Sequence, residues 1–157
     1  ETLRRIRKGA TIEQNIAARE MTLKAGLKCF GFFMIGLPWE DRSHLEETRK
    51  HIFDLNCNFM ELHIAVPYYG TQLYKDAVAA GVLADTPLGK DYFNSPTTGT
   101  IHLAMPEIEA FRKQTLLKFH LRTSYVVARL REAATNPKIL ANYSKFAYRL
   151  AINNLRN

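Results

Sequence analysis

The chain has 157 residues and carries 22 Lys and Arg against 15 Asp and Glu, a formal charge of +7. With 46% hydrophobic and 24% charged residues it has the composition of a globular protein, which excludes an intrinsically disordered, collagen-like or disulfide-rich chain. Its apolar runs fall far short of the roughly 20 residues that cross a bilayer, and Glu1 opens no secretory leader. We therefore expect a cytoplasmic protein and an excerpt of a longer one.

The charge is unevenly distributed along the chain. Residues 1–105 contain 12 basic and 12 acidic side chains, whereas residues 106–157 contain 10 basic and 3 acidic ones. The whole positive excess therefore lies in the last third, which predicts two regions with different roles.

The first elements in the sequence alternate between helix and strand. Thr11 is a good helix N-cap and Gly26 a good C-terminal stop, which predicts a helix over 11–25. Residues 27–35 are almost continuously apolar, a pattern typical of a parallel strand covered on both faces.

A further helix, strand and helix follow in the same order. Ser43 and Glu46 have the spacing of a capping box, which predicts a helix that continues through Leu55. Residues 58–66 indicate a second strand, and a turn then leads to a helix over 71–81. Alternating strands and helices of this length are typical of parallel βα units. Because two parallel strands leave open edges, we predict that these units belong to a larger barrel or open sheet.

The rest of the chain is predicted to be an irregular connection followed by helices. Residues 82–105 are rich in turn-forming residues and contain at most a short strand at 100–104. A long helix is expected from Pro106 to about residue 134, and a basic amphipathic helix after Asn136 and Pro137. We therefore divide the chain into three parts, residues 1–81, 82–105 and 106–157.

The basic stripe of the helical tail leaves several partners open. Its members Lys118, Arg122 and Arg129 could be a solvated face, or they could contact anionic lipid head groups or nucleic-acid phosphates. An acidic neighbouring domain is another candidate. Since the apolar sides of the helices must also be buried, we favour packing on the barrel with the basic side outward.

Two loops at the ends of the predicted strands are the candidate ligand site. The segment 31–40, GFFMIGLPWE, and the segment 67–71, PYYGT, place glycine and proline where each strand ends. Ligand sites of parallel α/β folds lie at these ends, although plain βα turns need the same residues. Glu61 and His63 share one strand face with Ala65, and polar groups in apolar surroundings need partners.

Other kinds of site find little support. His44, Glu47 and His51 share a helix face, but their charged neighbours indicate a solvated surface rather than a metal site. Cys29 and Cys57 are too few and too far apart in sequence for a CxxC metal site or a disulfide framework. Nucleophile-elbow and phosphate-loop motifs are absent from the sequence.

The segments 31–40 and 63–74, the latter HIAVPYYGTQLY, resemble radical S-adenosylmethionine enzymes. They are most similar to the subgroup with an N-terminal cobalamin-binding domain, which includes anaerobic magnesium-protoporphyrin monomethyl ester cyclases and hopanoid-associated members. Residues 1–9 and 119–130 fit the same resemblance. It implies that residues 1–81 are the C-terminal half of a partial (β/α)6 TIM-like barrel, followed by a helical tail.

The resemblance also implies a cofactor-binding set, with no catalytic residue in this chain. Met34 would contact the adenine of S-adenosylmethionine, Gly36 would take the place of a glycine in the family's GxIxGxxE pattern, and Glu40 that of its acid. The other members lie in the segments 31–40 and 63–74 that carry the resemblance, and they are Pro38, His63, Ala65 and Pro67.

The family's CxxxCxxC cluster motif has no counterpart in this chain. The resemblance therefore implies the C-terminal fragment of an Fe–S oxidoreductase, inactive by itself, whose [4Fe–4S] ligands and cobalamin domain lie in a missing N-terminal part. That part and a small-molecule substrate would be its partners, and radical formation from S-adenosylmethionine would need it. The alternative is a non-enzymatic interaction or membrane-surface module with a basic helical tail; nucleic acid is not expected.

Overall fold

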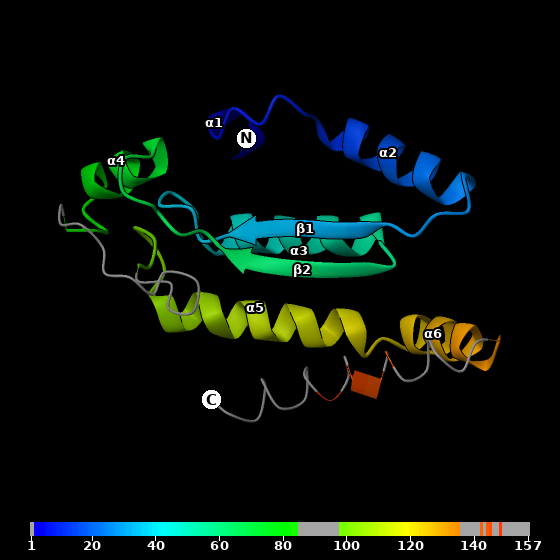
Figure 1. Cartoon of the computed structure of the whole chain (residues 1–157). Coiled ribbons are helices and arrows are strands. Elements are labelled where there is room, and N and C mark those ends of the chain that lie inside the picture. The colour runs from blue at the N-terminus through cyan, green and yellow to red at the C-terminus, as the bar shows by residue number, and fades with distance from the viewer. Residues whose placement is uncertain (1, 85–97, 136–141, 143, 146–147, 149–157) are drawn as a thin grey trace. The chain divides into compact units, whose positions relative to one another are not determined.

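The computed structural model describes residues 2–84, 98–135, 142, 144–145 and 148 (Figure 1). The chain forms two compact units, Glu1–Ile108 and Glu109–Asn157. Within the described residues there are six helices and one two-stranded parallel sheet, which confirms the predicted α/β class. The division of the chain at residues 81 and 105 stays a prediction.

The first unit opens with two helices, α1 (Thr2–Arg5) and α2 (Ile12–Lys24). The predicted cap at Thr11 is confirmed, because its side chain accepts from the Gln14 N–H while the Gln14 side chain accepts from the Thr11 N–H. None of the residues of α2 is buried, and Ile12 is 46% exposed. Local capping rather than core packing therefore defines this helix.

The sheet consists of β1 (Phe30–Ile35) and β2 (Phe59–Ile64), paired in parallel along their full length. Because side chains alternate across a strand, one face of the sheet is buried and the other is exposed. The buried face is covered by α3 (Arg42–Leu55), which lies behind the strands in Figure 1. The outer face carries Phe30, Phe32, Met34, Phe59, Glu61 and His63.

The outer face corrects one expectation. The apolar run 27–35 predicted a strand covered on both faces, yet Phe32 is 70% exposed and Phe30 is 47% exposed. Only α3 packs on the sheet closely among the helices of the first unit, and it covers one side. The apolar composition of this strand therefore reflects a surface that the first unit leaves open.

Helix α3 begins two residues earlier than the sequence predicted. Its N-cap is Asp41, whose carboxylate accepts from the His44 N–H at 3.1 Å, and the predicted cap Ser43 instead donates its hydroxyl to Asp41 at 2.7 Å. The predicted capping box of Ser43 and Glu46 was therefore wrong. A carboxylate at the cap also interacts favourably with the positive end of the helix dipole.

The end of the first unit contains α4 (Gln72–Ala79) and a tight turn. Thr71 caps α4 through its hydroxyl, as the sequence predicted. The predicted short strand at 100–104 was wrong: Thr100 donates its N–H to the Leu103 carbonyl at 2.8 Å, which closes a turn. The Ile101 N–H donates to the Pro38 carbonyl at 2.9 Å and fixes this turn to the loop after β1.

The second unit contains most of α5 (Met105–His120) and all of α6 (Thr123–Thr135). The single helix predicted from Pro106 to about residue 134 was wrong, because the chain breaks between His120 and Thr123. Phe119, His120 and Tyr125 pack their rings together at the break, with centroids 5.2–5.6 Å apart. The Arg122 guanidinium lies 3.9 Å from the Phe119 ring centroid and covers this cluster.

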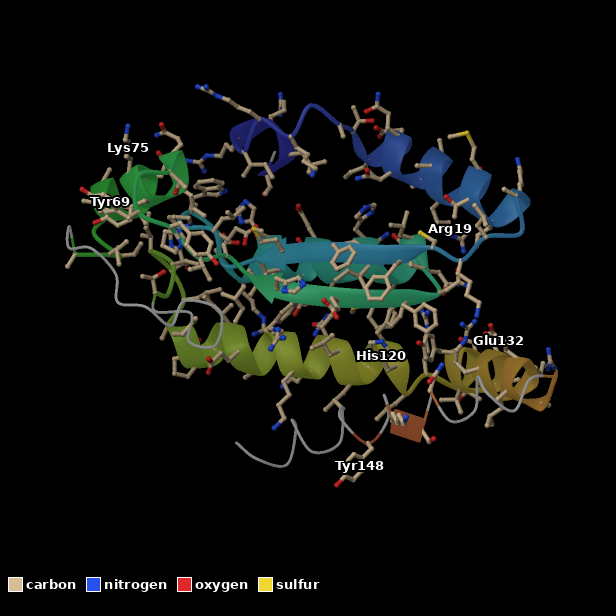
Figure 2. All side chains as sticks on the ribbon, in the orientation of Figure 1. Arg19, Tyr69, Lys75, His120, Glu132 and Tyr148 are labelled. Atoms are coloured by element: carbon tan, nitrogen blue, oxygen red, sulfur yellow. The ribbon has the colours of Figure 1, made fainter. Side chains whose placement is uncertain are left out.

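The basic stripe is partly engaged inside the second unit. The Arg129 guanidinium lies 5.4 Å from the Tyr125 ring centroid and also pairs with Glu132 at 3.0 Å; Figure 2 labels Glu132 on α6. These contacts place two of the three predicted stripe residues against neighbouring side chains.

The last predicted helix, after Pro137, lies almost wholly outside the described residues. No helix in the described part of the chain combines the length and apolarity that crossing a membrane requires.

Candidate cofactor-binding site

The loop after β1 is closed by the buried carboxylate of Glu40. This residue is 1% exposed, and its Oε2 accepts from the N–H groups of Gly36 at 2.7 Å and Leu37 at 3.1 Å. Burial raises the pKa of Glu40 above its usual value, while the two N–H bonds act in the opposite direction. The Oε2 atom of this carboxylate is therefore engaged by its own loop.

Gly36 is the first residue of the loop after β1. Its φ of +83° lies in the left-handed region, which a residue with a side chain adopts only at a cost. A Cβ at this position would also lie 3.0 Å from Cγ2 of Ile64 and 3.5 Å from Cγ2 of Ile108. Conformation and close packing both require glycine here.

The middle and C-terminal part of the outer face carry a group of four exposed side chains. Met34 pairs with His63 in the strand register, and Phe32 pairs with Glu61. The Phe32 and His63 rings are nearly parallel, 18° apart with centroids at 6.2 Å. His63 Nε2 lies 3.1 Å from Glu61 Oε2, and both side chains are about half exposed. We call these four residues, Phe32, Met34, Glu61 and His63, the outer-face cluster.

Aromatic side chains continue this surface toward the start of the strands. The Phe30 ring stacks on Phe32 with centroids 4.8 Å apart and on Phe59 at 5.9 Å. Lys28 Nζ lies 5.9 Å from the Phe59 ring centroid. The outer face is therefore an apolar aromatic surface with Glu61 at its middle and His63 near its C-terminal end.

The seven residues that the sequence singled out separate into two groups. Met34 and His63 lie side by side on the outer face, and both are exposed. The other five are buried in the two loops at the C-terminal ends of the strands; they are Gly36, Pro38, Glu40, Ala65 and Pro67. A hydrogen bond from the Ala65 N–H to the Ile35 carbonyl, 2.8 Å long, joins the starts of these loops.

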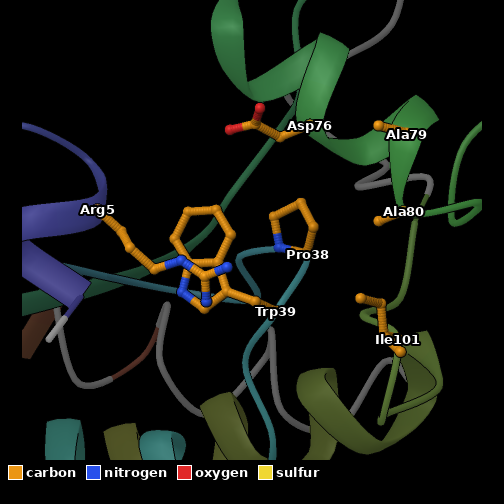
Figure 3. A pocket seen from close by; sticks show the side chains of 7 residues that line it. All are labelled: Arg5, Pro38, Trp39, Asp76, Ala79, Ala80 and Ile101. Atoms are coloured by element: carbon orange, nitrogen blue, oxygen red, sulfur yellow. The ribbon is translucent and has the colours of Figure 1, made fainter.

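A cleft of about 350 Å³ opens beside the same loops (Figure 3). The Arg5 guanidinium lies 4.4 Å from the Trp39 ring centroid on one side. The remaining lining residues come from α4, the loop after β1 and the turn after residue 100: Pro38, Asp76, Ala79, Ala80 and Ile101. Sequence analysis missed this cleft because no local pattern brings Arg5 to Trp39.

The helix face of His44, Glu47 and His51 has other contacts. His44 Nδ1 lies 2.7 Å from Asp41 Oδ1 at the helix cap, and the His51 ring packs edge-on against Phe33 with centroids 6.2 Å apart. Within the described residues there is no group of three His, Cys, Asp or Glu side chains that could hold a metal ion.

Comparison with known proteins finds similarity to one named enzyme class. No family model matches the chain. A protein of Pyrococcus horikoshii named as an uncharacterized methyltransferase is 31% identical over 122 residues, which cover 78% of this chain and 27% of that protein. The chain thus spans about a quarter of the length of this curated relative.

This similarity corrects the functional predictions. The relative is named a methyltransferase, so the predicted radical S-adenosylmethionine Fe–S oxidoreductase of the cobalamin-binding subgroup was wrong. Nothing in the described residues supports the predicted [4Fe–4S] cluster or cobalamin. The error has a physical origin: glycine and proline after a strand satisfy the turn geometry that parallel βα units need in any family.

Proposed function

We propose that this chain is part of an S-adenosylmethionine-dependent methyltransferase and that the outer-face cluster contacts the methyl donor. The proposal rests on the name of the Pyrococcus relative together with the exposed outer-face cluster, which extends from the middle of the strands toward their C-terminal ends. The donor supplies a methyl group on a sulfonium centre, which passes to a nucleophilic acceptor. No residue of this chain is assigned to the transfer step.

The chemistry of the outer-face cluster fits this donor. Its adenine is flat and apolar on both faces, and the exposed Phe32 ring and Met34 thioether offer a surface of the same kind. Its sulfonium is a cation, which aromatic faces and carboxylates attract; Phe32 and Glu61 supply one of each. Glu61 Oε2 lies 3.1 Å from His63 Nε2 and so orients the imidazole.

The buried residues of the two loops support this surface from behind. The bonds from Gly36 and Leu37 to Glu40 fix the backbone that directly follows the last residue of β1. In this proposal Gly36, Pro38, Ala65 and Pro67 set the shape of the loops, and Glu40 positions them without contacting the donor.

We further propose that strands from a longer polypeptide extend the sheet into a partial (β/α)6 barrel with the outer face inside. Sheets are generally stable with three or more strands, and the only strands in the described residues are β1 and β2. A barrel interior would cover the Phe30 and Phe32 rings, which this unit leaves exposed. The rest of that polypeptide is then the partner of this chain, and a small-molecule acceptor its substrate.

Binding of S-adenosylmethionine to the longer polypeptide that contains this chain tests the proposal. We expect isothermal titration calorimetry to detect binding, and Met34→Lys to weaken it by about tenfold, or ~1.4 kcal/mol, because an added cation repels the sulfonium. Met21→Lys is the matched control: Met21 is 65% exposed on α2, away from the sheet, and Met34 is 52% exposed. Absence of binding, or equal loss in both variants, contradicts the proposal.

A further inference from the structure

The fold brings the two cysteines of the chain into contact. Cys29 Sγ and Cys57 Sγ lie 3.3 Å apart, although 27 residues separate them in the sequence. Cys29 directly precedes β1 and Cys57 lies two residues before β2, so the parallel pairing places both at the N-terminal end of the sheet. The sequence spacing excluded a CxxC metal site and a disulfide framework, and it did not predict this contact, which the fold creates.

Backbone hydrogen bonds hold this contact in place. The Cys29 N–H donates to Asn58 Oδ1 at 2.8 Å, and the Cys29 carbonyl accepts from the Phe59 N–H at 3.2 Å. Both bonds cross between the two segments that carry the cysteines. The sulfur contact therefore follows from the strand register.

We propose that Cys29 and Cys57 form a reversible intramolecular disulfide by exchange with a small disulfide of the glutathione type. Closing the present 3.3 Å to a bond of ~2.05 Å requires an approach of about 1.2 Å, which side-chain rotation and small backbone shifts can supply. Gly31 makes room for the buried sulfur, since a Cβ there would lie 3.1 Å from Cys57 Sγ.

The two thiols have different environments, and this difference indicates which of them reacts first in the disulfide exchange. Cys29 is partly exposed, whereas Cys57 is only 2% exposed. Burial, followed by the contact with Cys29, raises the pKa of Cys57 to about 12. Cys29 is therefore the thiol that an external disulfide reaches first.

The thiol–disulfide exchange takes place in two steps. The Cys29 thiolate attacks one sulfur of oxidised glutathione and releases one glutathione thiolate. Cys57 then loses its proton to solvent and attacks the Cys29 sulfur of the mixed disulfide, which expels the second glutathione. Arg19, labelled on α2 in Figure 2, bonds to the Asn56 carbonyl at 3.2 Å, and its charge favours the Cys57 thiolate. Overall two protein thiols are oxidised and one glutathione disulfide is reduced.

This site is independent of the proposed methyltransferase function. It lies at the N-terminal end of the strands, whereas Met34 and His63 lie near the C-terminal end. Disulfide formation and S-adenosylmethionine binding can therefore succeed or fail separately.

The test equilibrates the folded chain in glutathione buffers of graded ratio without oxygen, quenches it with acid and measures intact mass and free thiols. We expect the loss of two hydrogen atoms and of both free thiols. Half of the folded chain should be oxidised at a ratio of reduced to oxidised glutathione about tenfold higher than the same chain requires in urea, because the fold holds the two sulfurs together. A lasting glutathione adduct without an internal bond, covalent dimers, or equally easy oxidation in urea overturns the proposal.

Single variants test the order of reaction. Cys57→Ser should take up one glutathione on Cys29, whereas Cys29→Ser, which retains only the buried thiol, should react in urea but not when folded. Far-UV circular dichroism checks that each variant folds, and the wild-type comparison does not depend on them. Equal modification of the two folded variants overturns the assignment of Cys29 as the attacking thiol.

Discussion

Replacing Glu40 by alanine should destabilise the first unit more than any other single change in the loop after β1. The substitution leaves the buried N–H groups of Gly36 and Leu37 without their acceptor. Each unsatisfied buried N–H costs about 1–3 kcal/mol, so the expected loss is about 2–6 kcal/mol, partly offset because a buried charge is also removed. Glu40→Gln keeps an acceptor oxygen at the same reach and should lose less than half as much.

Urea unfolding followed by circular dichroism measures both variants, with the free energy of unfolding extrapolated to water. Because burial raises the folded-state pKa of Glu40 above 4.5, the folded state binds more protons than the unfolded state in the window between the two values. The contribution of Glu40 is therefore complete below pH 4.5 and decreases as pH rises through the folded-state pKa. Relative to Glu40→Gln, the wild-type chain should lose stability across this window. Equal destabilisation by alanine and glutamine would refute the hydrogen-bond argument.

Three further changes have outcomes that the structure predicts. Gly36→Ala should cost about 1–3 kcal/mol in urea unfolding, because φ is +83° and the new Cβ would lie 3.0 Å from Ile64 Cγ2; no change would contradict the left-handed conformation. Forming the Cys29–Cys57 disulfide should raise the free energy of unfolding by about 3–4 kcal/mol for a loop of this length, and reductant should reverse the gain. The pKa of Asp41 is lowered by the Ser43 hydroxyl and His44 bonds, so its stabilising effect is present above pH 3.8 and decreases below it. Asp41→Asn should flatten this acid dependence in a pH series of thermal melts, and an unchanged profile would refute the assigned cap.

Local sequence signals were sufficient to predict most helices and strands of the first unit. The caps at Thr11 and Thr71 satisfy N–H groups within three residues along the chain, so they can be identified without knowing the fold. Ser43 was wrongly chosen over Asp41 because two acceptor side chains compete at the start of α3, and their mutual hydrogen bond decides between them. The break between α5 and α6 contains no proline or glycine, so the sequence gives no local signal for it. It coincides with the packing of the Phe119 and Tyr125 rings, which depends on the tertiary structure.

The candidate site was only partly accessible to sequence reasoning. The resemblance proposed Met34 as an adenine contact and included His63 in the second matching segment, but only the register places them directly opposite each other. Glu40 was selected as a ligand position, yet the structure gives its carboxylate two backbone partners. The iron–sulfur and cobalamin predictions were wrong because they depended on glycine and proline in turns after strands. These residues satisfy a backbone geometry that many families share, so they do not identify a cofactor.

The sequence by itself determined the parallel α/β character of this chain, its neutral first part and its basic tail, because periodicity and charge are properties of short segments. Only the tertiary structure decided which distant residues meet. The strand register brings Cys29 to Cys57 and Met34 to His63, and it leaves an aromatic face open to solvent. The physical reason is that parallel strands are joined through an intervening helix, so their contacts depend on how the whole unit packs rather than on local pattern.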